Sequence, residues 1–197
     1  MTRCWTFACA LSLALGAPAL AERAPTPEQP PAAAPPVASE TRDELFARLA
    51  AARDPDEAAG IVGAIDRLNL HSGSDTGDLL MARAVATMDG GNYPVSLALL
   101  DAIVGLQPGW AEGWNKRATA RYLAGDVKGA VADIAQTLAR DPRHLEALAA
   151  LGMILEDSGL RAEALRAYQR ALTIAPQWRP IVEAAARVKA ALAGQAL

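Results

Sequence analysis

Three prolines lie at one fixed interval in this chain, because Pro108, Pro142 and Pro176 are each 34 residues apart. Cutting the chain at that interval gives three blocks of equal length, 77–110, 111–144 and 145–178. Small residues and turn glycines recur at the same places in each block, namely Ala84, Ala118 and Gly152, then Gly91, Gly125 and Gly159, then Ser96, Ala130 and Ala164. Such a period predicts stacked units of secondary structure, each in contact with its neighbours, rather than one globular core.

Each block has the pattern of two helices joined by a turn. In the second block, Gly125 and Asp126 mark the turn, and Asp126 is a good N-cap for the helix that ends near Arg140. In the first block, Asn92 takes the capping place and Pro94 lies in the first helical turn. We therefore expect six helices between residues 77 and 178.

Helical signals also flank the three blocks. Thr41 and Glu44 have the spacing of a capping box, and Asp54 followed by Pro55 marks a second helix start. We expect residues 41–76 to form an atypical helical pair ahead of the repeats, since a terminal unit has one side in water. Pro180 opens a last helix within 179–197, which we expect to cap the C-terminal end. The fold class predicted is therefore all-α.

The first 40 residues have a different composition. Arg3 precedes an uncharged apolar run, and Ala19-Leu20-Ala21 is a cleavage pattern, so residues 1–21 are predicted to be a cleaved secretory signal peptide. A signal that is kept as a membrane anchor is the alternative. Cys4 and Cys9, the only cysteines, lie in that segment, so the mature chain would have no disulfide. Residues 22–40 are rich in proline and alanine and are predicted to be a disordered linker.

Composition narrows the function. The 19 Lys and Arg residues against 22 Asp and Glu residues give a net charge of −3, which argues against nucleic acid and anionic lipid as partners. The two histidines, His71 and His144, stand far apart, and the sequence has no zinc-protease motif, nucleophile elbow or phosphate-binding loop. We expect no enzyme activity, metal ion or cofactor, and we expect His144 to be a packing residue.

The block pattern resembles the tetratricopeptide repeat. The third block matches best, with Leu148, Gly152, Ala164, Tyr168, Ala171 and Pro176 at family places, and the second has Trp114, Ala118, Ala130 and Pro142. Departures from the pattern are Arg117, Arg121 and Thr137 in the second block and Arg83, Thr87 and Ser96 in the first, which keeps Pro108. The resemblance implies a right-handed superhelical α-solenoid. We expect small residues to let helices approach, and a buried Trp114 to fill the space between blocks.

The resemblance also implies a concave groove lined by the first helix of each block. Carried over by place, its candidates are Asp78, Met81, Val85, Met88 and Asp89, then Glu112, Asn115, Thr119, Tyr122 and Leu123, then Glu146, Ala149, Met153, Glu156 and Asp157. We select Met81, Val85, Met88, Asn115, Thr119, Tyr122, Met153 and Glu156 as the partner-binding residues. Methionines suit an adaptable apolar groove, but they could equally fill gaps between helices. The clamp for a C-terminal carboxylate found in some family members is not expected, because Met81, Val85 and acids stand at its places.

The sequence thus predicts a non-catalytic scaffold that binds a peptide or protein segment. The signal pattern and the resemblance to small exported repeat proteins of Gram-negative bacteria suggest the periplasm and a role in assembling or maintaining the cell envelope. Alternatives are an assembly chaperone, for example for apo-cytochrome c, an accessory subunit of an envelope enzyme, or a binder of a small ligand. Self-association through the groove or an exposed end is also possible.

Overall fold

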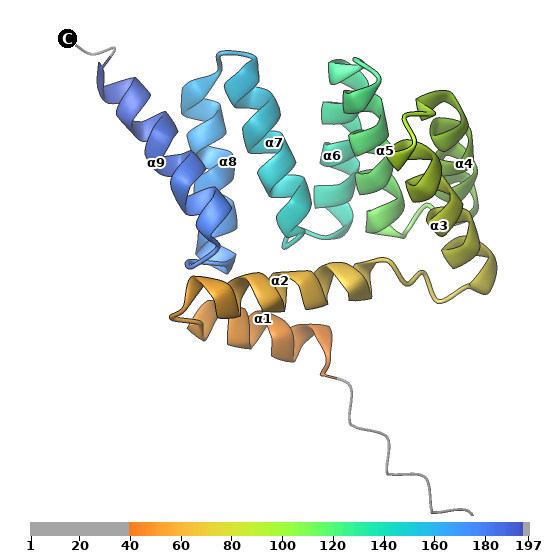
Figure 1. Cartoon of the computed structure of the whole chain (residues 1–197), viewed down its shortest axis with the longest axis horizontal. Coiled ribbons are helices and arrows are strands. Elements are labelled where there is room, and N and C mark those ends of the chain that lie inside the picture. Colours follow the sequence, from red (N-terminus) through yellow and green to blue (C-terminus); the bar gives the residue numbers. More distant parts are fainter. Residues whose placement is uncertain (1–39, 195–197) are drawn as a thin grey trace, which may run out of the picture. The chain divides into compact units, whose positions relative to one another are not determined.

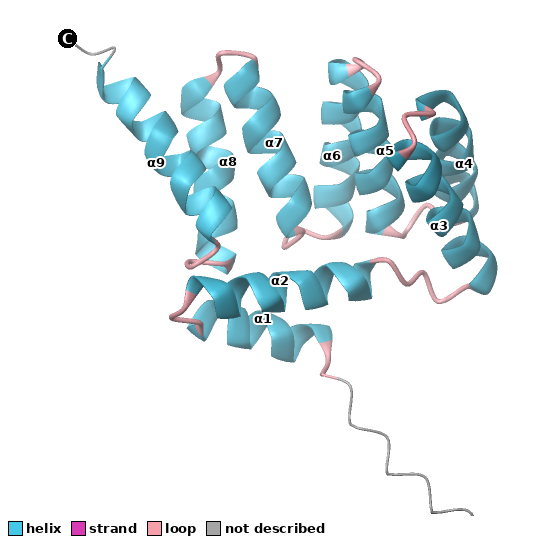
Figure 2. Ribbon diagram, viewed as in Figure 1, coloured by secondary structure: helices cyan, strands magenta, loops and turns pink. Residues whose placement is uncertain are grey.

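The computed structural model describes residues 40–194, which form nine α-helices and no β-strand (Figure 2). Two helices precede the repeats, α1 (Arg42–Ala51) and α2 (Pro55–Asn69). The repeats contain α3 (Asp75–Asp89), α4 (Tyr93–Leu106), α5 (Ala111–Leu123), α6 (Val127–Arg140), α7 (Leu145–Asp157) and α8 (Arg161–Ile174). The last helix is α9 (Arg179–Gly194). The all-α prediction is confirmed; the signal peptide and most of the linker lie outside the described residues.

The predicted helix starts have the expected local geometry. The Thr41 side chain accepts a hydrogen bond from the Glu44 backbone, and the Glu44 carboxylate binds the Thr41 backbone in return, which is a complete capping box. The side chains of Asp54, Asn92 and Asp126 each accept a hydrogen bond from a backbone amide at the start of α2, α4 and α6. These side chains satisfy backbone amides that a helix leaves unpaired at its start, so the boundaries follow from local sequence.

The turn glycines within the blocks adopt a conformation that favours glycine. Gly91, Gly125 and Gly159 have φ angles of 74°, 85° and 77°, in the left-handed region. Each ends the first helix of its block and allows the second to fold back. The recurrence of glycine at this place is therefore explained by backbone geometry.

The helices stack in chain order (Figure 1). The two helices of each block pack on one another, the second helix of a block packs on the first helix of the next, and α9 packs on α8. Ala118, Ala130 and Ala164 are almost fully buried where helices approach closely. At Gly152 a methyl group would overlap the ring of Tyr168, so the small residue leaves room for the aromatic one.

Departures from the repeat pattern compensate for one another inside the second block. Arg117 and Arg121 replace apolar residues, and both bind Asp133, a carboxylate that is only 3% exposed, at 2.8 and 3.0 Å. Arg117 also reaches Asp101 of α4 at 2.8 Å. In the first block, the hydroxyl of Ser96 donates to the Ala84 carbonyl at 2.9 Å. Arg117, Arg121 and Ser96 thus have partners in these interfaces, which limits their desolvation cost.

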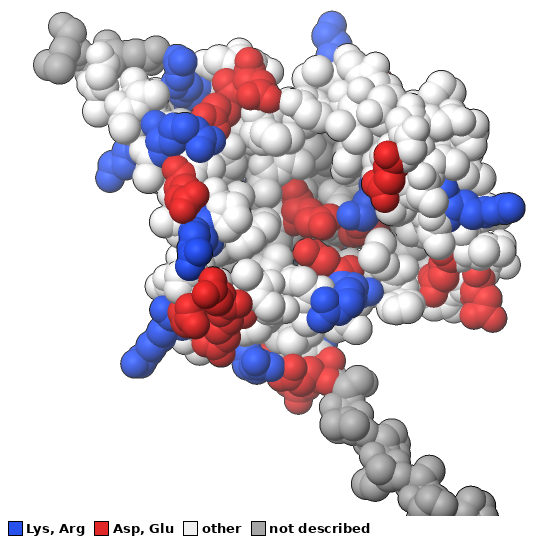
Figure 3. Space-filling model, in the orientation of Figure 1, with Lys and Arg blue, Asp and Glu red and all other residues white. Residues whose placement is uncertain are grey.

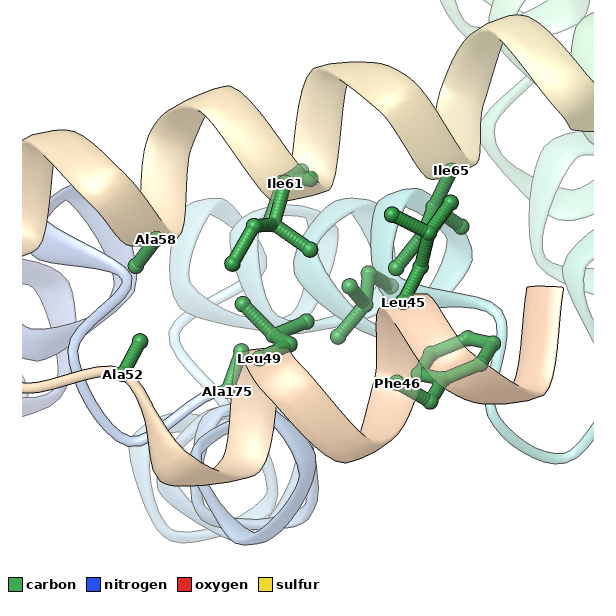
Figure 4. Close-up of a cluster of buried hydrophobic side chains, with 10 residues drawn as sticks. Leu45, Phe46, Leu49, Ala52, Ala58, Ile61, Ile65 and Ala175 are labelled. Atoms are coloured by element: carbon green, nitrogen blue, oxygen red, sulfur yellow. The ribbon is translucent and has the colours of Figure 1, made fainter. Parts of the chain in front are cut away.

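The N-terminal hairpin α1–α2 lies across the ends of the repeat helices rather than in line with them (Figure 1). Its apolar side chains, including Leu49, Ile61 and Ile65, form a core cluster with Leu145 and Ala175, which come from the loop edge of the third block (Figure 4). This differs from our expectation of a terminal unit ahead of the first repeat. The physical reason is that the hairpin finds apolar partners at the loops between blocks.

Ion pairs at the same edge attach the hairpin further. Arg42 binds Asp141, and Asp43 accepts from Arg143 at 2.6 Å. At the other end of the edge, Asp56 accepts from Arg179 at 3.2 Å. The pairs of Asp43 and Asp56 are exposed and add little energy singly, while the Arg42–Asp141 pair is partly buried. We therefore expect the apolar cluster to do most to fix the hairpin.

The last residue of each block faces this edge. Trp110 donates through its indole nitrogen to the Asn69 carbonyl at 2.9 Å, and Trp178 packs against the hairpin cluster. His144, the equivalent residue in the second block, is 1% exposed. The recurrence of large ring side chains at this place is thus explained by the hairpin that runs along it.

Trp114 corrects one expectation. Its side chain is only partly buried and is absent from the apolar core clusters of the described residues. The indole ring lies between the guanidinium groups of Arg117 and Arg140, at 4.7 and 4.5 Å from the ring centroid. Its nitrogen donates to the Pro108 carbonyl at 3.0 Å. Trp114 therefore makes cation–π contacts near the surface instead of filling the core between blocks.

Candidate functional site

The predicted groove consists of two hollows. The first, of about 370 Å³, is lined by Asp78, Met81 and Val85 of α3 together with Leu70 and other residues near the end of α2. The second, of about 520 Å³, lies between α5, α7 and α9. Its lining residues are Asn115, Lys116 and Thr119 of α5, Glu146, Ala149, Ala150 and Met153 of α7, and Tyr168, Trp178, Ile181, Ala184 and Arg187. We call this second hollow the α5–α7–α9 groove.

The three methionines differ in their surroundings. Met153 is 42% exposed and lines the α5–α7–α9 groove. Met81 is 2% exposed and Met88 is 9% exposed, and both belong to the core cluster between α3 and α4. Met88 lines neither hollow, so its selection as a groove residue is corrected. It fills a gap between helices, which is the alternative that the sequence left open.

Tyr122 and Glu156 are occupied by contacts within the chain. The Tyr122 hydroxyl donates to Asp157 at 2.7 Å, and this bond raises the pKa of the Tyr122 phenol. Glu156 accepts from the Tyr168 hydroxyl and from Arg187, each at 3.0 Å. The Arg187 hydrogen bond is the main cause of the lowered pKa of Glu156. These contacts tie α7 to α5, α8 and α9 beside the groove.

The polar floor of the groove is a fixed network. The Asn115 side-chain amide donates to Glu112 at 3.2 Å and to Glu146 at 2.8 Å. The Lys116 ammonium reaches the same two carboxylates at 3.0 and 2.9 Å. Since Asn115 and Glu112 are each 2% exposed, these partners hold the side chains in one arrangement.

His144 extends the network beneath the floor. Its Nε2 lies 2.8 Å from Glu112, and its Nδ1 accepts the backbone amide of Ala147 at 3.3 Å. Because Nδ1 is an acceptor, the ring proton is on Nε2 and is donated to the Glu112 carboxylate. The expectation of a packing residue was incomplete, since His144 is buried but also acts as a helix cap and a hydrogen-bond donor.

Charges in the network shift its protonation equilibria. Burial would raise the pKa of Glu112, but the His144 hydrogen bond and the Lys116 charge hold it below its ordinary value. Burial opposes the charge of Lys116 as well, yet Glu112 and Glu146 raise the Lys116 pKa. The neighbouring Asp66 of α2 is partly buried, and burial together with the charges of Glu146 and Glu112 raises its pKa to about 7. Figure 3 shows acidic side chains gathered around a basic one in the hollowed centre of the molecule.

Sequence reasoning did not find Asp66 or the buried role of His144. Glu112 and Lys116 have the i,i+4 spacing of a helical ion pair, and Glu112 and Glu146 stand at the same place in consecutive blocks. The sequence alone could therefore have predicted that these three residues lie close together. No such signal points to Asp66, because α2 reaches the network only through the docking of the hairpin.

This arrangement is suited to binding. The groove combines apolar walls with a few pre-positioned polar groups, as ligand sites do. Within residues 40–194, no three His, Cys, Asp or Glu side chains are grouped so that they could hold a metal ion. Over the same range, every helix is too short or too polar to cross a bilayer.

Comparison with known proteins gives matches along most of the repeat region. The tetratricopeptide repeat model matches residues 145–178, the third block. A TPR repeat-containing protein of Rhizobium etli is 37% identical over 152 residues, which cover 77% of this chain and 74% of that protein.

Solved structures of proteins bound to peptides are similar in fold to this chain. The first TPR of Spaghetti (RPAP3), bound to the HSP90 peptide SRMEEVD, has a TM-score of 0.58 at 18% identity, covering 61% of this chain and 95% of that one. The Yersinia enterocolitica type III secretion chaperone SycD, in complex with a peptide of the translocator YopD, has a TM-score of 0.55 at 17% identity, with coverage of 59% and 94%. At such identities the likeness concerns the fold.

Proposed function

This chain belongs to the tetratricopeptide repeat family, and we propose that it is a non-catalytic scaffold whose α5–α7–α9 groove binds a peptide or protein segment. The observation that carries the proposal is the groove itself, about 520 Å³ in volume, with Met153 42% exposed on its wall and Asn115 fixed in its floor. The Spaghetti and SycD domains, which share the fold, hold peptides in their solved structures.

The ligand that fits this groove is an apolar segment. Ala149, Ala150, Ile181 and Ala184 offer apolar surface, while the partly exposed carboxylate of Glu146 offers a hydrogen-bond acceptor. The positive charge of Lys116 is already neutralised by Glu112 and Glu146. The other cation that lines the groove, Arg187, is paired with Glu156. An acidic peptide such as SRMEEVD would therefore meet only paired cations in the described groove, and we expect it not to bind.

The test is selection of displayed peptides on the full chain. Peptides recovered on the wild-type protein are measured by fluorescence anisotropy against Met153→Asp and Ala149→Arg, which change the groove wall. We expect affinity to fall at least about tenfold, which corresponds to about 1.4 kcal/mol. Leu160→Asp is the matched control, because Leu160 is 49% exposed in the turn before α8 and away from the groove.

Peptides that bind the groove variants as tightly as the wild type would contradict the proposal. So would tight binding of SRMEEVD that Met153→Asp leaves unchanged. Circular dichroism of each variant shows whether the helices are retained, so that a loss of affinity reports on the groove.

We also propose that the scaffold acts in the periplasm, in assembly or maintenance of the cell envelope. The support is the signal pattern in residues 1–21 and the proline-rich segment that follows it. Mass spectrometry of the protein from fractionated cells tests this: a periplasmic form that begins at Glu22 is expected, and a cytoplasmic form that keeps residues 1–21 would contradict it.

A further inference from the structure

A second surface is left open where the repeat stack begins. In internal repeats, the third and tenth places of the first helix are covered by the second helix of the preceding block. Gly113 of α5 would carry a Cβ only 2.8 Å from Ile103 of α4, and Ala120 is fully buried beside α4. On α7, Ala147 and Ile154 are buried in the same way beside α6.

No preceding helix covers these places on α3 in the described part of the chain. Leu79, the equivalent of Gly113 and Ala147, is 61% exposed, and Ala86, the equivalent of Ala120 and Ile154, is also exposed. Ala82 lies between them on the same stripe and is exposed as well, although its equivalents Lys116 and Ala150 line the α5–α7–α9 groove. The hairpin α1–α2 does not cover this face, because it lies across the ends of the repeats (Figure 1). We call Leu79, Ala82 and Ala86 the open stacking face.

The open stacking face adjoins the first hollow. Ala82 lines the 370 Å³ cavity together with Leu70, Met81 and Val85. An incoming helix could therefore contact the face along its length and insert one large apolar side chain into the cavity beside Ala82. Opposite Leu79 the partner helix would need a small residue. Between α4 and α5 the large side chain is Ile103 of α4 and the small residue is Gly113 of α5, whereas here α3 supplies the large side chain, Leu79.

Acidic residues mark both ends of this face. Asp75, Leu79, Ala82, Ala86 and Asp89 follow the heptad spacing of one helical stripe, and all five are exposed. Asp75 suits the start of α3, where the helix dipole favours an acid. Asp89 is at the end of the helix, where the dipole disfavours an acid, so helix stability does not explain it.

We propose that the open stacking face binds an amphipathic helix of a partner protein. This partner helix would carry an apolar stripe of small and large residues, with a basic residue at each end of the stripe. The partner helix would take the position that α4 takes on α5 and α6 takes on α7, so the established interface between repeats continues across it. Basic flanks complement Asp75 and Asp89.

A second copy that uses the same face fits less well. Parallel packing of two α3 helices places Asp75 against Asp75 and Asp89 against Asp89, and antiparallel packing places Asp75 against Asp89. Either arrangement brings like charges together, which opposes association. The charge pattern therefore disfavours symmetric α3–α3 pairing, and light scattering separates a partner helix from α9 of a second copy, whose Arg187 and Lys189 are also exposed.

The test uses two synthetic helical peptides of about four turns, identical in an Ala and Leu stripe. One carries Lys at both ends of the stripe and the other carries Glu. Binding to the full chain is measured by fluorescence anisotropy, with Leu79→Asp and Ala86→Glu as face variants. Met153→Asp, in the α5–α7–α9 groove, and Leu160→Asp serve as controls that should not change this binding.

We expect the Lys-flanked peptide to bind more tightly, and its affinity to fall at least about tenfold in both face variants. The double variant Asp75→Asn/Asp89→Asn should reduce the preference for Lys by about two- to fivefold per acid. Equal binding of both peptides, or loss only in Met153→Asp, would overturn the proposal. A dimer in light scattering that Leu79→Asp abolishes would overturn the assigned partner in favour of a second copy. The groove proposal is tested separately, since it concerns different residues.

Discussion

Asp66 shows how one partly buried carboxylate couples stability to pH. Its pKa is raised to about 7 by burial and by the charges of Glu146 and Glu112, which outweigh the opposing effect of Lys116. A raised pKa in the folded state means that the protonated side chain is favoured there. The stabilising contribution is therefore complete below the ordinary pKa near 4 and is lost as pH rises through about 7.

We predict that Asp66→Asn raises the melting temperature at pH 8 and leaves it nearly unchanged at pH 4. The increase should be about 2–4 °C, as about 1 kcal/mol produces in a chain of this size, because partial solvent contact screens the charge. Thermal melts at both pH values check this, with Glu183→Gln on the exposed surface of α9 as the control. A lower melting temperature for Asp66→Asn at pH 8 would show that the charged form is the stabilising one.

For Trp114, the sequence predicted the position in the repeat correctly but not the surroundings of the side chain. The repeat places a large side chain there, but the guanidinium groups of Arg117, which departs from the pattern, and of Arg140 lie over its ring. Spacing predicts which residues share a helix face. It does not predict which long polar side chains will cover that face.

We predict that Trp114→Ala costs about 2 kcal/mol, less than the roughly 3–5 kcal/mol of a fully buried Trp, because the ring is partly solvated. The chain should remain folded, with a lower urea midpoint and unchanged helical circular dichroism. Trp114→Phe, which keeps a ring between the two arginines, should recover part of the loss. Complete unfolding of Trp114→Ala at room temperature would restore the view that this ring fills the core.

Helices and turns were the most predictable elements. The caps at Thr41, Asp54, Asn92 and Asp126 and the glycine turns depend on contacts within a few residues, so local sequence determines them. The groove was predicted only in part, because Met88 and Met153 were both assigned to it by family place yet differ in burial. Which of them faces solvent depends on neighbouring helices that sequence spacing does not describe.

Two helical glycines give opposite expectations. Gly152→Ala would drive a methyl group into the Tyr168 ring between α7 and α8, and we predict a loss of about 1–3 kcal/mol. Gly60→Ala in α2 meets no atom within 4 Å, and the better helix propensity of alanine should stabilise the chain by up to about 1 kcal/mol. Chemical denaturation of both variants checks the pair. Equal effects on the unfolding free energy would mean that helix propensity, and not packing against Tyr168, decides both positions.

At the scale of the whole molecule, the hairpin α1–α2 changes how a repeat stack behaves. In a simple stack each unit contacts only its neighbours, and stability is a sum of local terms. Here one hairpin contacts residues of three consecutive blocks, through Trp110 of the first, Asp141 of the second and Leu145 of the third. The sequence did not reveal this, because the contacts join segments that are far apart along the chain and follow no period.

The hairpin should therefore make unfolding more cooperative than the repeats alone would be. Leu49 is 0% exposed at the centre of the hairpin cluster, and Leu49→Ala should cost about 2–5 kcal/mol. We predict that calorimetry shows one transition shifted to lower temperature, and that hydrogen exchange speeds up in α7 and α8 as well as in α1. Leu68→Ala, at a position of α2 that is 38% exposed, is the control and should change little. The prediction is contradicted if the hairpin melts alone while hydrogen exchange in α7 and α8 stays unchanged. In that case the edge contacts carry no coupling between blocks. The curvature of the α5–α7–α9 groove would then be set by the repeats themselves.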